Sequence, residues 1–250
     1  MTQQIVIMSL AVLGAATLQA ATGIGFGVIA GPILLAMMNS GDAIQISILM
    51  NLLIALVLVP SLRAHTDWRL LKWLAAGTLI GMPLGLIVFL NISILKLKLL
   101  AALAVLLALG FVLRGMLSAR GRARGQGRPD PSVWQSLPVG AVSGLMGGAL
   151  AMPGPVPAGW MSAAGYGKAA VRASILMLFV FSYGAALVLQ IWLAGIARDT
   201  WITGFQLAPA AIAGIFIGKA LSHRISELVF SWLVAATLVL TAGMLFISLA

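Results

Sequence analysis

The 250-residue sequence predicts an all-α polytopic membrane protein with two homologous repeats. Three observations predict this fold class. Apolar residues make up 62% of the chain and charged residues only 8%, and the mean hydropathy is +1.12, a composition far from that of soluble domains. Apolar runs of about 20 residues, each long enough to cross a hydrocarbon core, follow one another along nearly the whole chain. The two halves also share an ordered series of motifs.

The first apolar segment, residues 3–40, is expected to be a broken helix that turns back on itself. Its stretch "QAATGIGFGVIAGPILLAMMNSGD" sets five glycines and a proline among apolar residues. In a helix interior glycine costs about 1 kcal/mol and proline about 3 kcal/mol, so we expect the break at 22–27. The N-terminus lacks a basic region and its apolar run continues past any cleavage point, which favours a retained helix over a signal peptide.

Three uninterrupted spans should follow the broken segment in each half. In the first half we expect them at 43–62, 69–90 and 94–117. In the second half a broken segment at 133–164 precedes spans at 169–193, 201–221 and 227–249. These ranges divide the chain into a first repeat (1–117), a linker (118–131) and a second repeat (132–250).

The linker, "SARGRARGQGRPDP", is the densest basic cluster of the chain, with four arginines among helix breakers. We expect it to be cytoplasmic and to lie against anionic lipid head groups. The net charge of +10 does not indicate nucleic-acid binding. The other basic residues lie mainly between apolar runs, where the topology of membrane proteins places them.

The repeat is visible as motif pairs that occur in the same order. "GIGFGVIAGP" (23–32) resembles "GLMGGALAMP" (144–153), and "SILM" occurs at 47–50 and again at 174–177. In three further pairs, the two members are the same number of residues apart, and this number is larger than in the motif pairs above. These pairs are Trp68 and Trp201, Gly81 and Gly214, and Gly85 and Gly218. Spacings that stay constant between short insertions indicate a duplication.

The distribution of basic residues favours an inverted arrangement of the two repeats. If each broken segment is a hairpin whose ends emerge on one side, and the linker is cytoplasmic, only Lys96, Lys98 and Arg198 of the 15 Lys and Arg lie on the far side. If each broken segment crosses the membrane once, the numbers of Lys and Arg on the two sides of the membrane differ far less. The positive-inside rule therefore predicts inverted repeats, an architecture in which transporters hold their substrate near the midplane.

The two breaks predict an anion site. Non-helical backbone survives at membrane depth only where protein buries it or water solvates it. We expect amides near Gly25 to Val28 to be free at the start of a helix, where the helix dipole favours an anion, and the same arrangement at Gly147 to Ala149. The alternative reading is that the glycines serve close helix packing.

The ordered motifs are similar to those of the TauE/SafE family of sulfite and organosulfonate exporters, which carries a glycine-rich element ending in proline, then "AVGTSL", "VDW" and a glycine-rich helix in sequence. The first half offers "TGIGFGVIAGP", "AIQISIL", "TDW" and "GTLIGMPLG". The second offers "SGLMGGALAMP", "GKAAVRASIL", "RDTW" and "GIFIGKALSHRISE". The resemblance covers nearly the whole chain. It implies proton- or gradient-linked movement of a small anion such as sulfite or sulfoacetate, and we expect the protein in the cell inner membrane.

The sequence departs from the family at two related positions, where Gln45 and Arg172 stand in place of a small residue. An arginine one turn inside a span usually faces a cavity and could grip an oxyanion in bidentate fashion; the alternative is snorkelling to the interface. Gln19, Gln45 and Asn51 could instead form interhelical hydrogen bonds. The candidate substrate-binding residues are Thr22, Gly23, Gly25, Phe26, Gly27, Gln45, Asn51, Gly147, Gly148, Pro153 and Arg172.

Other functional classes find less support in the sequence. There is no cysteine, and two histidines and five acidic residues are too few for a convincing metal cluster, so we expect neither a metal nor a cofactor. Ser143 lies in a span without an evident base, which argues against an intramembrane hydrolase. A passive anion channel remains the main alternative to a carrier, and the sequence leaves a homo-oligomer open.

Overall fold

The computed structural model describes residues 2–23, 26–62, 66–118, 133–222 and 227–248. Within these ranges the chain forms ten α-helices and no strand. They are α1 (Thr2–Thr22), α2 (Phe26–Met38), α3 (Asp42–Leu58), α4 (Trp68–Asn91), α5 (Ile94–Ser118), α6 (Val133–Leu150), α7 (Pro155–Ala163), α8 (Lys168–Leu189), α9 (Arg198–Ser222) and α10 (Glu227–Ile247). A 3₁₀ turn, Val59–Ser61, follows α3, and a π-helical segment, Gln190–Ala194, follows α8.

The helices confirm the predicted class of an all-α protein with several membrane spans. Among the described residues, five helical stretches are long and apolar enough to cross a membrane: Gln3–Ala21, Trp68–Asn91, Ile94–Arg114, Ala169–Ala194 and Arg198–Leu221. The helix boundaries agree with the predicted ranges within a few residues. The basic linker falls almost wholly at 119–132, outside the described residues. Its cytoplasmic placement and the division into two repeats therefore stay predictions.

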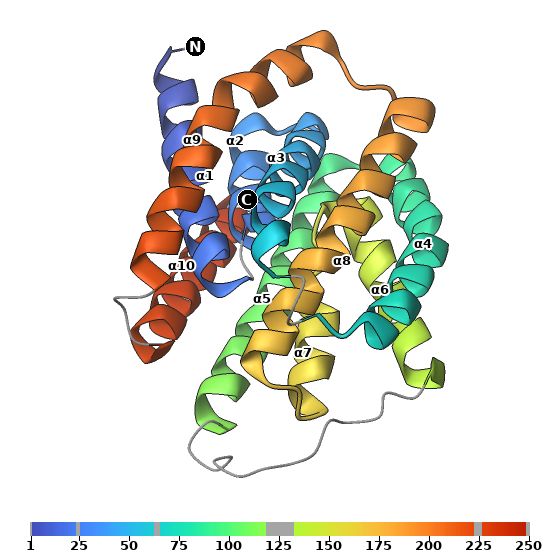
Figure 1. The fold of residues 1–250 in the computed structure, drawn as a ribbon. Helices are drawn as coiled ribbons and strands as arrows, with labels where there is room; N and C mark the ends of the chain where they lie inside the picture. Colours follow the sequence, from blue (N-terminus) through green and yellow to red (C-terminus); the bar gives the residue numbers. More distant parts are fainter. Residues whose placement is uncertain (1, 24–25, 63–65, 119–132, 223–226, 249–250) are drawn as a thin grey trace.

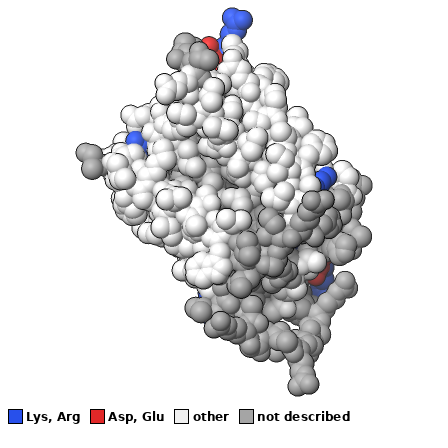
Figure 2. Space-filling view, turned by 90° about the vertical axis from the view of Figure 1, so that its left-hand side faces the viewer, with Lys and Arg blue, Asp and Glu red and all other residues white. Residues whose placement is uncertain are grey.

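The outer surface of the bundle is apolar. Trp192, Phe205 and Leu240 expose 82%, 72% and 74% of their surface, and Figure 2 shows a broad face with few charged side chains. A contiguous apolar surface of this extent suits contact with lipid tails and not with water.

Helices from the two halves of the chain pack against each other throughout the bundle (Figure 1). α1 packs along α9, and α4 packs along α6. α3 contacts α8, and α5 contacts α10. The short helix α2 is buried for most of its length and is surrounded by α1, α3, α5 and α10. Residues around the first break therefore lie inside the bundle.

Small residues permit the closest of these contacts. Gly81 on α4 faces the backbone of Ala141 on α6, and Gly144 on α6 faces the backbone of Thr78 on α4. A Cβ atom at either glycine would overlap the facing carbonyl oxygen. Thr78 also donates a hydrogen bond of 3.2 Å to the Gly140 carbonyl oxygen. Glycines spaced by four residues on both helices are typical of close packing in membranes.

The contact between α9 and α1 is also made by glycines that face the backbone of the neighbouring helix. Cβ atoms at Gly214 and Gly218 would overlap the carbonyl oxygens of Leu13 and Thr17 on α1. In the sequence repeat these two glycines correspond to Gly81 and Gly85. Close helix packing is therefore the role of this set of glycines.

Candidate functional site

The first break lies between Thr22, the last residue of α1, and Phe26, the first residue of α2. Gly23 has a φ of +81°, a left-handed conformation that favours glycine. Its amide donates to the Gln19 carbonyl oxygen at 2.7 Å, which closes the last turn of α1. Gly25 and the side chain of Thr22 lie outside the described residues. The break falls where the sequence predicts it.

Gln19 joins the two sides of this break. Its side chain is completely buried, and its Oε1 accepts a hydrogen bond of 2.9 Å from the amide of Phe26. One of the amides that we expected to be free at the start of α2 is therefore capped by a side chain from α1. The predicted interhelical role of Gln19 takes this form. The Phe26 ring itself is buried in the core.

Arg172, on α8, reaches the same break. Its guanidinium donates through Nη2 to the carbonyl oxygen of Ala20, and its Cγ lies so close to Gly23 that a Cβ there would overlap it. Nε is buried and, within the described part of the chain, has no hydrogen-bond partner. Arg172 thus holds one of the carbonyls that the end of α1 leaves without a helical partner, instead of snorkelling to the interface.

Replacing Arg172 with glutamine is expected to lower the thermal stability of the protein as well as its affinity for anions. The Ala20 carbonyl loses a charge-assisted hydrogen bond, which costs about 1–3 kcal/mol. Melting of the purified protein without added anion measures this effect. Arg198→Gln, at an exposed position, makes the same charge change and should melt like the parent. Equal melting temperatures for Arg172→Gln and the parent would contradict the capping role.

The second break begins at residue 151, three residues after the predicted Gly148. α6 ends at Leu150 and α7 begins at Pro155, with Ala151 at a φ of 55°. The expectation of free amides at Gly147 to Ala149 is therefore wrong, because these residues form the last turn of α6 and a helix ends in free carbonyls.

Carbonyls and prolines, not amides, dominate this break. The amide of Ala151 donates to the Gly147 oxygen at 3.0 Å, and the Ser143 hydroxyl donates to the oxygen of the buried residue Pro153 at 2.6 Å. Pro155 and Pro157 begin α7 and have no N–H. The first break therefore has more hydrogen-bond donors than the second.

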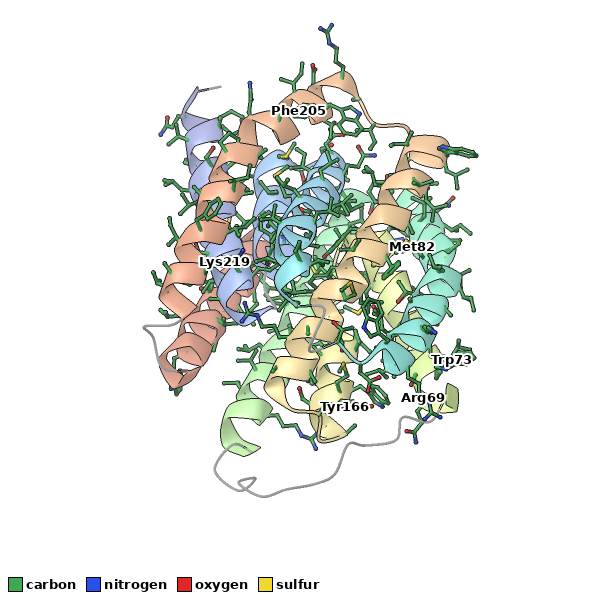
Figure 3. All side chains as sticks on the ribbon, viewed as in Figure 1. Arg69, Trp73, Met82, Tyr166, Phe205 and Lys219 are labelled. Atoms are coloured by element: carbon green, nitrogen blue, oxygen red, sulfur yellow. The ribbon has the colours of Figure 1, made fainter. Side chains whose placement is uncertain are left out.

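The glycine pair before the second break has two different environments. Gly148 faces the backbone of Met82 on α4 and so belongs to the α4–α6 packing contact. Gly147 faces inward, where a Cβ would lie 3.2 Å from the Ser182 hydroxyl oxygen. Figure 3 labels Met82, on the helix that Gly148 contacts.

The two breaks meet in the centre of the bundle. A Cβ on Gly27, in the first turn of α2, would lie 2.5 Å from the Ala151 carbonyl oxygen, 3.0 Å from the Tyr183 hydroxyl oxygen and 3.4 Å from Asn51 Nδ2. Tyr183 donates to the same Ala151 oxygen at 3.0 Å. The sequence places Tyr183 on a helix face with Gln190 but does not distinguish a site residue from a packing residue there.

Polar groups without partners collect around this meeting point. Asn51 is fully buried and donates through Nδ2 to the Ser47 oxygen at 2.8 Å. Asn51 Oδ1 and the Ser182 hydroxyl are buried and have no hydrogen-bond partner among the described residues. Buried polar groups normally have partners, so these atoms mark a place that a ligand or water could occupy.

Gln45 lies apart from the two breaks, one turn into α3. Its Nε2 donates to Gln190 Oε1 at 3.0 Å and to the Gly195 oxygen at 2.9 Å. It lines a cleft of about 520 Å³ formed by Ser40, Gly41, Asp42, Gln45, Phe89, Leu90 and residues 194–197. In the same cleft Asp42 accepts hydrogen bonds from Ser40 and Thr200.

Comparison with known proteins supplies the family. The family described as sulfite exporter TauE/SafE matches residues 8–245, nearly the whole chain. No curated protein and no solved structure matches the chain significantly. The family match, with a bundle of membrane-spanning helices, supports a multi-pass membrane protein. The chain belongs to the TauE/SafE sulfite exporter family.

Proposed function

We propose that this protein is a carrier, and not an enzyme, that moves a small sulfur-containing or organic anion across the cell inner membrane by alternating access. The family supports anion export. The observation that carries the proposal is the meeting of the two interrupted helices at Gly27 and Ala151. The site lies there, near the midplane, with Gly23, Phe26, Gly27, Asn51, Gly147 and Arg172 around it.

The proposed mechanism uses inverted repeats. The contact of α1 with α9 has its counterpart in the contact of α6 with α4, as a duplication of either orientation requires. Gln45 and Arg172, equivalent in the repeat, lie at different places: Gln45 beside the turn after α8, and Arg172 at the end of α1. Figure 1 draws that turn at the opposite end of the bundle from the end of α5. In Figure 3 the labelled Arg69 lies toward the same lower end of the bundle as the end of α5, on the other side of it. The latter end is cytoplasmic in this proposal.

The anion binds at the start of α2 because that end of the helix is positive. The polar groups of Asn51 and Ser182 replace part of its hydration shell. Rocking of the two hairpins against each other then opens the site to either side of the membrane in turn. The direction of net movement follows from the gradient.

The cleft beside Gln45 is the outer vestibule of this path, and the bonds of Gln45 to Gln190 and Gly195 close its inner end. Removing two hydrogen bonds of ordinary strength shifts a closed–open equilibrium about tenfold or more. We therefore expect Gln45→Ala to open the path from outside. Because the chain has no cysteine, a single cysteine at the fully buried Ser47 reports this opening without background.

The test compares labelling of Ser47→Cys by a membrane-impermeant anionic thiol reagent with and without Gln45→Ala. About tenfold faster labelling in the double variant is expected. Ser40→Ala is the matched control, because it alters the cleft wall but leaves the bonds of Gln45 intact. Equal labelling rates in all three proteins would refute the gate.

Transport itself is tested in proteoliposomes with radiolabelled sulfite. A carrier gives saturable uptake that unlabelled sulfite and sulfoacetate inhibit, and that is accelerated by the same anion loaded inside. Flux that rises linearly with concentration would favour a channel instead. No flux of any of these anions above that of protein-free liposomes would reject the proposal.

A further inference from the structure

The side-chain amide of Gln19 has one half bound and the other half free. Oε1 accepts from the Phe26 amide at 2.9 Å. Because a main-chain N–H can only donate, the atom that faces Phe26 must be the oxygen, and the orientation of the amide is fixed. Nε2 therefore lies beside the start of α2, completely buried, and has no hydrogen-bond partner among the described residues.

A second donor without a partner lies at the same break. Arg172 Nε is buried and unpaired within the described ranges, while Nη2 is held by Ala20 and the stem by Gly23. These contacts fix the guanidinium against Ala20 and Gly23, at the end of α1. Two buried donors, one on α1 and one on α8, and the positive end of the 13-residue helix α2 thus lie at the same break. A buried donor without an acceptor is costly, and an anion supplies the acceptor.

We propose that Gln19 is a direct ligand of the transported anion. Its Oε1 holds the first turn of α2 in place, and its Nε2 donates a hydrogen bond to one oxygen of the anion, while Arg172 Nε donates to a second oxygen. The inference rests on the proposed transport function and deepens it by naming the ligand class: oxyanions that carry at least two oxygens on one centre, such as sulfonates, sulfite and carboxylates. A monatomic anion such as chloride offers one acceptor atom in place of two oxygens.

Gln19→Glu tests the donor of the side-chain amide separately from its acceptor. The carboxylate keeps an acceptor for the Phe26 amide but replaces the donor with a second oxygen. Binding of methanesulfonate, which stays an anion at all working pH values, is measured by titration of the purified full chain in detergent. We expect at least a tenfold loss of affinity at pH 8, with little change in melting temperature without ligand. Affinity should recover as the pH falls, because a protonated carboxyl group again donates.

Matched variants separate this role from a structural one. Gln135→Glu, at an exposed position near the start of α6, makes the same chemical change and should bind methanesulfonate like the parent. Gln19→Leu removes the acceptor as well, so it should lose stability in addition to affinity. Parental affinity in Gln19→Glu would overturn the ligand role and leave the transport proposal intact. If the parent binds neither methanesulfonate nor sulfite, the anion site itself is wrong.

A measurement on the unmodified protein decides the matter if Gln19→Glu does not fold. In protein labelled with ¹⁵N-glutamine, the Gln19 side-chain signal is assigned by its absence from Gln19→Met. That signal is expected to shift when methanesulfonate is added but not when chloride is added at the same ionic strength. A signal that responds to neither salt, in protein that binds methanesulfonate, would overturn the proposal.

Discussion

Replacing Gly27 with leucine is expected to abolish anion transport. A Cβ at this position already lies 2.5 Å from the Ala151 carbonyl oxygen, and the rest of the side chain would fill the space between the two breaks. The breaks would be pushed apart, and the Tyr183 hydroxyl would lose its place on Ala151. Initial uptake of labelled sulfite in proteoliposomes should fall to the level of protein-free liposomes, a loss of at least a hundredfold.

The same helix offers a control. At Gly31, one turn further along α2, a Cβ would lie 3.5 Å from the Ser47 hydroxyl oxygen, an ordinary contact. Gly31→Ala should therefore transport at a rate within about twofold of the parent, while Gly27→Ala should already lose most activity. Normal uptake by folded Gly27→Leu would show that no substrate passes between the breaks.

Replacing Gly81 with valine is expected to cause a large loss of stability. The new side chain would overlap the Ala141 carbonyl oxygen on α6, and a backbone cannot move aside as a side chain can. Overpacking of a core costs about 1–3 kcal/mol, and separation of α4 from α6 along a shared glycine stripe adds to this. Thermal melting in detergent should shift downward by more than 10 °C, a shift typical of ~3 kcal/mol or more in a chain of this size.

Gly110 on α5 provides the comparison, because a Cβ there would meet no atom within 4 Å. Gly110→Val should fold and melt close to the parent. If Gly81→Val melts at the same temperature as Gly110→Val, the close approach of α4 and α6 would not exist in the membrane protein. Gly214→Val should resemble Gly81→Val, because it meets the α1 backbone in the same way.

The helix boundaries and the first break could be predicted because they depend on local sequence. Apolar runs end at charged or turn-forming residues, and Gly23 and Gly27 stand on either side of the break. The second break could not be placed from its glycines. Gly148 is needed for contact with α4, and the left-handed position is taken by Ala151, a residue that gives no such signal in a sequence.

The partners of individual polar side chains depend on tertiary packing, which a pattern of residues does not contain. Arg172 could be recognised as unusual from its position one turn inside a span, but its contact with the end of α1 could not. Gln19 and Gln45 look alike in sequence, each a glutamine in an apolar run. One caps α2 and the other bridges to the turn after α8, because the helices that face them differ.

The most direct test of the central claim is to locate a bound substrate analogue. An experimental structure of the protein with 2-bromoethanesulfonate, whose bromine is visible by anomalous scattering, gives the position of the anion. The account predicts density for the sulfonate beside Gln19 and the first turn of α2, close to where Gly27 meets Ala151. Density only in the cleft beside Gln45, or at the outer surface, with the space between the breaks filled by side chains, would contradict it.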